Sequence, residues 1–185
     1  MRSILHVGES AFTELRDGWD KLAGRGITNT PFQSWAYQRA WYEHLKPKDS
    51  TLITVATRND AGDLVGVACL FALDQILHFN GCIEETDYLD LIAPPDLADE
   101  VWQATLNCLE ATDVVSWRVL DLCNIPEQSP TRTILSTFAE KKSYSFEENV
   151  IEVCPIIQLP DAFDSYLESL DSKQRRELNR KLRRA

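Results

Sequence analysis

Long hydrophobic runs are absent from this chain of 185 residues. The first eight residues carry one positive charge but no apolar stretch of the length that a signal peptide needs. No later run approaches the roughly 20 apolar residues that cross a bilayer. We therefore expect a cytoplasmic protein that does not contact a membrane.

Cysteines are few and never closely spaced, which argues against two kinds of scaffold. No pair has the C-x-x-C spacing of a zinc knuckle or a redox motif, and the odd number does not suit a disulfide framework. The sequence therefore predicts no metal site and five reduced, structural thiols. They are Cys69, Cys82, Cys108, Cys123 and Cys154.

Histidine is also scarce. His6, His44 and His78 are scattered, and no recognisable motif places a serine or cysteine nucleophile beside them. We therefore expect structural histidines.

Positive charge is in deficit over most of the chain. The sequence has 19 basic and 29 acidic residues, a net charge of −10. Residues 173–184 hold seven basic residues and one acidic residue, a local net of +6, so the remainder carries −16. An acidic body repels nucleic acid and anionic membranes, so contact with a polyanion would have to come through the basic segment.

Apolar residues recur with both helical and strand periods, which predicts one α/β domain. Strand signals are found at residues 4–7, 51–58, 64–73, 87–92, 117–122, 144–146 and 150–159, the last interrupted by Pro155. Helix signals are found at residues 10–22, 30–45, after Pro94 and Pro95, at 129–141 and from 161 onward.

Several stretches resemble the CelD-like acyltransferases, which are bacterial proteins related to the FemAB peptidyltransferases. They are residues 31–35 with Trp41, then 62–68, 87–92, 120–122, 124–131 and 154–184. The predicted element order is similar to that of the GNAT acyltransferase fold, whose central mixed, mostly antiparallel sheet is flanked by helices. The family carries two such modules in tandem. The resemblance therefore implies a GNAT-like domain at 1–160 and a basic helical connector to a second module at 161–185.

Residues 92–98 depart from the family pattern. A GNAT module holds the pyrophosphate of acyl-CoA on backbone N–H groups of a glycine-bearing loop, where the helix after the fourth strand begins. The corresponding stretch has no glycine, Pro94 and Pro95 lack the N–H donor, and Asp96 would repel phosphate. We expect no cofactor in this chain, and acyl-CoA, such as acetyl-CoA, in a full-length family member.

The basic segment supplies the candidate site residues. Lys173, Arg175 and Arg176 resemble the basic residues of the helix that joins the two modules in FemAB-like proteins. The resemblance implies that they contact an anionic group of the substrate. The alternative is that Leu178 and Leu182 pack on a second module while the charges stay in water.

Two other clusters allow both a functional and a structural interpretation. Glu84, Glu85 and Asp87 could supply a general base for an amine, or they form a solvated acidic loop. Aromatic side chains between residues 35 and 42 could stack on a ligand, or they pack in the core. They are Trp35, Tyr37, Trp41 and Tyr42.

The function that the resemblance implies is half of a GNAT-type N-acyltransferase, which moves an acyl group from acyl-CoA to an amine. This half would shape the acceptor side or support the fold, and would be inactive alone. Expected partners are a second GNAT-like module or a second copy of the chain, and a small-molecule, glycan or peptide amine. The alternatives are a non-catalytic interaction domain and an anion- or nucleic-acid-binding module acting through the basic segment.

Overall fold

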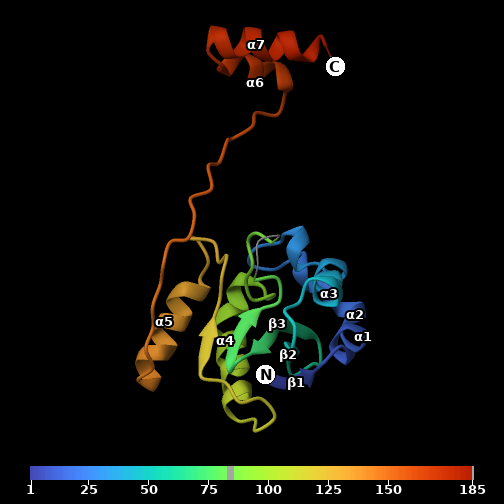
Figure 1. The fold of residues 1–185 in the computed structure, drawn as a ribbon, viewed down its shortest axis with the longest axis vertical. Coiled ribbons are helices and arrows are strands. Elements are labelled where there is room, and N and C mark those ends of the chain that lie inside the picture. The colour runs from blue at the N-terminus through green and yellow to red at the C-terminus, as the bar shows by residue number, and fades with distance from the viewer. Residues whose placement is uncertain (83–85, 185) are drawn as a thin grey trace. The chain divides into compact units, whose positions relative to one another are not determined.

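The computed structural model describes residues 1–82 and 86–184, which divide into two compact units, Met1–Glu148 and Asn149–Ala185. In the first unit five strands form one sheet, and their order in the sheet is their order in the chain (Figure 1). They are β1 (Arg2–Val7), β2 (Thr51–Arg58), β3 (Leu64–Leu73), β4 (Ile76–Phe79) and β5 (Val119–Asp121).

Strands β1 to β4 are antiparallel neighbours, whereas β5 runs parallel to β4. The β2–β3 hairpin closes through Gly62, whose φ of +89° suits glycine. The β3–β4 hairpin closes through Asp74 and Gln75, which both have positive φ, as a two-residue hairpin turn of type I′ requires. A parallel neighbour needs a crossover, and the helix α4 (Ala98–Glu110) supplies it.

Helices cover both faces of the sheet. Ile53 and Val55 of β2 point to the face on which α4 and α5 (Thr131–Lys142) pack, and Leu52 and Ala56 point to the opposite face. This alternation follows from the two-residue period of a strand. The second face is covered by three short helices, α1 (Ser10–Glu14), α2 (Arg16–Ala23) and α3 (Trp35–His44). The α/β class with a mixed, mostly antiparallel sheet flanked by helices is therefore confirmed.

Several predicted boundaries were wrong. The helix expected at 10–22 is split at Leu15, and the helix expected from Thr30 starts as the short 3-10 turn η1 (Pro31–Gln33) before Ser34 caps α3. Residues 87–92 form no strand and make only an isolated bridge between Ile92 and Val67. The third antiparallel neighbour is β4, which the sequence did not predict.

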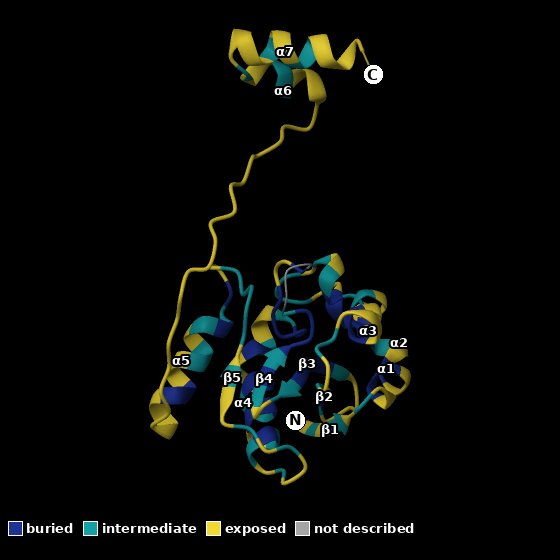
Figure 2. Cartoon of the chain, viewed as in Figure 1, coloured by how far each residue is buried: buried dark blue, intermediate teal, exposed yellow. Residues whose placement is uncertain are grey.

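The predicted strands at 144–146 and 150–159 are also wrong, because both segments have no regular structure. Residues 149–162 are exposed throughout (Figure 2). The second unit contains two helices, α6 (Phe163–Ser169) and α7 (Ser172–Leu182). The division falls after Glu148, whereas the sequence placed the domain boundary after residue 160.

Candidate functional site

The carboxyl ends of β4 and β5 are the place in this sheet where a catalytic cleft is expected. Because the two strands are parallel, their carboxyl ends lie at the same edge of the sheet, where ligands of open α/β sheets commonly bind. The connection from β4 to α4 starts at this edge. It contains residues 92–98, the stretch that corresponds in sequence to the pyrophosphate loop of a GNAT module.

The start of α4 has few groups that could bind an anion. The 3-10 turn η2 (Pro95–Leu97) precedes the helix, and Pro94 and Pro95 have no N–H to donate. Asp96 lies in this turn, and Asp99 and Glu100 lie in the first turn of α4, all three exposed. Carboxylates are stabilised at the positive end of a helix, and there they repel phosphate.

Residues 86–92 fill the space beside the strand ends. The N–H of Leu89 donates to the carbonyl of Asn124 at 3.0 Å, and Nδ2 of Asn124 donates to the carbonyl of Thr86 at 2.6 Å. Leu89 is 2% exposed, and Leu91 is fully buried. The chain after β4 thus packs against the chain after β5.

Asp90 is the one buried carboxyl group in this segment among the described residues. Oδ1 accepts from the N–H of Leu91 at 2.7 Å and from Oγ1 of Thr131 at 2.5 Å, and Oδ2 accepts from the hydroxyl of Ser129. Burial raises the pKa of Asp90, and these hydrogen bonds oppose the rise. Because Oγ1 of Thr131 also accepts from Nε1 of Trp102 at 2.8 Å, the network connects α4 and α5.

Three buried amide side chains lie next to this network. Nε2 of Gln38 donates to the carbonyl of Asn80 at 3.0 Å, and Nδ2 of Asn80 donates to the carbonyl of Gln38 at 2.8 Å. Nε2 of Gln33 donates to the carbonyl of Asp90. The cavity between them holds about one water molecule at most, so it has no room for a substrate.

Cys69 lines the same small cavity but is not suited to nucleophilic chemistry. Burial raises the pKa of its thiol to about 12, because the thiolate would lose its hydration. A nucleophilic cysteine needs a lowered pKa. Cys69 is therefore a core residue, as the sequence predicted.

The prediction of five free thiols was wrong, because Cys82 and Cys123 form a disulfide with a Cα–Cα distance of 5.7 Å. Cys69, Cys108 and Cys154 are free. Cys82 follows β4 and Cys123 follows β5, and parallel pairing brings the two strand ends together. The spacing of 41 residues gave no signal, because the sequence did not predict β4.

Two of the three histidines lie close to carboxylates near the surface. Nδ1 of His78 lies 3.4 Å from a carboxylate oxygen of Asp121, and its ring stacks on Phe71 with centroids 5.0 Å apart. Nδ1 of His6 lies 3.3 Å from a carboxylate oxygen of Glu14. His44 is exposed in the last turn of α3. No described serine or cysteine is hydrogen-bonded to any of the three.

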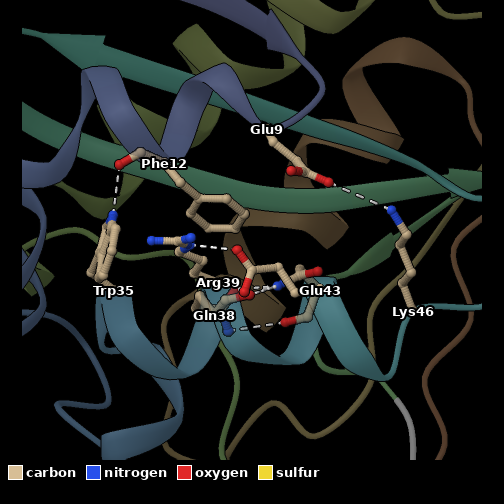
Figure 3. Close-up of polar contacts among 8 residues, drawn as sticks. Glu9, Phe12, Trp35, Gln38, Arg39, Glu43 and Lys46 are labelled. Carbon is tan, nitrogen blue, oxygen red and sulfur yellow. Dashed lines mark hydrogen bonds and ion pairs between the residues drawn. The ribbon is translucent and has the colours of Figure 1, made fainter.

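The aromatic residues of α3 pack within the fold. Trp41 and Tyr42 are buried. Nε1 of Trp35 donates to the carbonyl of Phe12 at 2.7 Å (Figure 3), and the guanidinium carbon of Arg16 lies 3.6 Å from the ring centroid of Trp35. Figure 3 also shows the ion pair between Nζ of Lys46 and a carboxylate oxygen of Glu9, 3.7 Å apart.

Of the acidic cluster suggested as a general base, Asp87 is exposed. Glu84 and Glu85 lie outside the described residues.

The three basic candidates lie on α7 of the second unit but point differently. Arg175 is half-buried, and Nη2 donates to the carbonyl of Leu170 at 3.2 Å, so this side chain packs toward α6. Lys173 and Arg176 are exposed. Arg176 lines an open hollow together with Asn179, Arg180, Arg183 and Arg184. These five residues were not predicted as a group from the sequence. Helical spacing could have grouped these arginines.

Comparisons with known proteins add little. The chain matches no protein-family model and no curated protein. An aminoglycoside acetyltransferase from an uncultured soil metagenomic sample aligns with 85% of this chain and 100% of its own, at 12% identity and a TM-score of 0.44. A likeness this weak carries no argument about function.

No described helix is both long and apolar enough to span a bilayer. Within residues 1–82 and 86–184, no three histidine, cysteine or acidic side chains gather as a metal site requires.

Proposed function

We propose that this chain is the acceptor-side, structural half of a GNAT-type N-acyltransferase and that it does not bind acyl-CoA by itself. The observation that carries this proposal is the closed edge beside β4 and β5. Residues 86–92 occupy it, and the 3-10 turn and the first turn of α4 that follow hold three carboxylates after two prolines. A pantetheine arm would have to displace these packed residues, and a pyrophosphate would find no N–H cradle.

The strand order supports the assignment to this fold. Four antiparallel strands, a helical crossover and a fifth, parallel strand follow one another as the family resemblance implies. The two strands that would complete such a module are absent from residues 144–159. In this proposal the first unit keeps part of the scaffold of the module and lacks its cofactor site.

The second unit carries a basic surface of its own. Arg176 and its neighbours Arg180, Arg183 and Arg184 form a basic surface on one side of α7, and Lys173 precedes them by one turn. Guanidinium groups bind phosphate and carboxylate well, so we propose that this surface contacts an anionic part of the acceptor or of its carrier. Arg175 would hold α7 against α6 instead.

The proposal is tested first by titrating acetyl-CoA into the full chain in a calorimeter. We expect no measurable heat of binding. A micromolar dissociation constant that Asp96→Ala changes would place a cofactor at the start of α4 and overturn the proposal.

The second test searches for a second module that acts together with this chain. We expect a second module with a glycine-bearing pyrophosphate loop, and acyl transfer from acetyl-CoA to an amine. Arg176→Glu should then lower kcat/KM for the acceptor about tenfold, because one charge-assisted contact is replaced by repulsion. Lys48→Glu, the same charge change on an exposed lysine of the first unit, should leave it unchanged.

An interaction domain without catalysis is the second candidate, and the segment before α6 favours it. Val150, Val153 and Ile156 are 82%, 85% and 75% exposed. Contiguous exposed apolar residues commonly mark protein-binding surfaces. Stable capture of a protein partner by the full chain, lost on Val153→Asp, in the absence of any acyl transfer would favour this candidate.

A further inference from the structure

The Cys82–Cys123 bond lies at the edge where the two parallel strands end. Cys82 is three residues beyond the end of β4, and Cys123 is two residues beyond the end of β5. Both residues are half-buried and pack at the margin of the core. The N–H of Cys123 also lies 3.1 Å from Sγ of Cys82.

The bond reinforces the same contact that closes this edge. Asn124, the residue after Cys123, holds Thr86 and Leu89 through its side-chain amide and its backbone carbonyl. Gly81, the residue before Cys82, has a φ of +116°, and a Cβ there would lie 3.2 Å from side-chain atoms of Leu89 and Thr86. The covalent link therefore fixes the two chain segments between which residues 86–89 are packed.

The free cysteines of the first unit differ from this pair. Cys69 is buried between the sheet and its helices, with a thiol pKa raised to about 12. Burial raises the pKa of Cys108 as well. Both thiols therefore ionise poorly and are weak nucleophiles. The bonded pair instead lies half-buried beyond the ends of β4 and β5, so breaking its bond removes a covalent link between these two strand ends.

We propose that Cys82 and Cys123 form a thiol–disulfide exchange site whose substrate class is dithiols. In the oxidised state the bond holds residues 86–89 against the end of β5. In the reduced state that segment is held by its hydrogen bonds and apolar contacts alone. The balance of dithiols and disulfides around the protein would thus determine how firmly residues 86–89 are held at the strand ends.

The exchange is balanced as follows in atoms and electrons. One thiolate of a reduced dithiol attacks one sulfur of the Cys82–Cys123 bond, so that a mixed S–S bond forms while the original bond breaks and the other cysteine leaves as a thiolate. The second thiolate of the dithiol then attacks the mixed bond and releases the second cysteine. The protein gains two electrons and two protons, and the dithiol loses them and leaves as a disulfide.

The test begins with counting thiols in the full chain. Protein alkylated in denaturant without reductant should show three free thiols, Cys69, Cys108 and Cys154, and five after reduction in denaturant. Native protein treated with dithiothreitol should also reach five, and oxidised dithiothreitol should return it to three. Five free thiols after the oxidised reagent would overturn the proposal. So would a bond that dithiothreitol breaks only in denaturant, since it would then be a permanent brace.

The second measurement is amide hydrogen exchange on the oxidised and reduced forms of the wild-type chain. We expect reduction to increase exchange at Leu89 and Asn124 and to leave the middle of β2 unchanged. Cys82→Ser should reproduce the reduced pattern without reductant, and Cys154→Ser should keep the oxidised pattern. If Cys82→Ser fails to fold, the two wild-type forms still decide. Identical exchange at Leu89 and Asn124 in both would overturn the proposal.

Discussion

Oγ1 of Thr131 donates a hydrogen bond to Oδ1 of Asp90 at 2.5 Å, across 41 residues of sequence. Thr131 opens α5, and Asp90 lies in the segment that fills the edge beside β4 and β5. The bond therefore fixes α5 and this segment relative to each other. Substitution of Thr131 measures how much this hydrogen bond contributes to the stability of the first unit.

Thr131→Val should lower the free energy of unfolding by about 1–3 kcal/mol, because valine keeps the shape but leaves Nε1 of Trp102 and Oδ1 of Asp90 short of a partner. Thr133→Val is the matched control on the same helix, since Thr133 is exposed and should change stability little. Urea unfolding followed by tryptophan fluorescence measures both. Equal effects of the two substitutions would contradict the assigned role of Thr131.

Asp90→Asn should flatten the pH dependence of stability. Burial raises the folded-state pKa of Asp90 above its unfolded-state value, so the folded protein holds this proton more tightly. The contribution is fully present below the unfolded-state pKa, about 3.9, and is lost as pH rises through the raised folded-state pKa. Urea unfolding across this interval should show a decline with pH for the wild type that is smaller for Asp90→Asn. Asp99→Asn, which removes an exposed carboxylate of α4, is the control, and a slope matching that of Asp90→Asn would refute the assignment.

Gly66→Ala should destabilise the first unit by about 1–3 kcal/mol through overpacking. A Cβ at residue 66 would lie 2.2 Å from Cγ1 of Val101, so β3 and α4 could not keep their present separation. Gly24→Ala is the control, because its Cβ would meet only backbone atoms at 3.4 Å or more.

The Gly66 effect can also be rescued. In a Val101→Ala background the added methyl has room, so Gly66→Ala should cost less there than in the wild type. Additive losses in the double-mutant cycle would mean that the contact with Val101 does not set the constraint.

Asp171→Ala should weaken α7 by about 1 kcal/mol, because Oδ1 of Asp171 accepts from the N–H groups of Lys173 and Gln174 at 2.8 and 2.9 Å. Hydrogen exchange at residues 173–176 should rise, while unfolding of Met1–Glu148 stays as it was. Asp161→Ala, an exposed residue before α6, should not change exchange in α7. Unchanged protection in Asp171→Ala would show that the cap does not determine helix stability.

The sequence predicted the elements whose residues carry a local signal. Alternation identified β2 and β3, and the Asn, Asp and Gly residues between them identified their turn. Helical spacing identified α4, where Val101 and Leu109 are buried as expected. The departure from a pyrophosphate loop was also readable, since it depends on residue types alone.

The missing elements depend on contacts that are distant in sequence. β4 is only four residues long, and the turn before it uses Asp74 and Gln75 instead of glycine, so no turn signal marked it. Without β4 there was no reason to bring Cys82 near Cys123 or to expect Asp90 inside the fold. The sequence predicted the basic helix but not which arginines share a side of it, because Arg175 lies against Leu170 through a contact that residue types alone do not indicate.

The exposed segment before α6 also carries a self-assembly hazard, and Pro155 limits it. Runs of six or seven apolar, β-prone residues without proline stack into cross-β fibrils. Pro155 divides residues 150–159 into two shorter runs, and Glu152 places a charge in the first. Gatekeepers of this kind keep such a stretch from templating its own copies. Pro155→Val would join the two runs into one. The pyrrolidine ring of Pro155 therefore helps to keep the chain dispersed and to prevent it from forming amyloid.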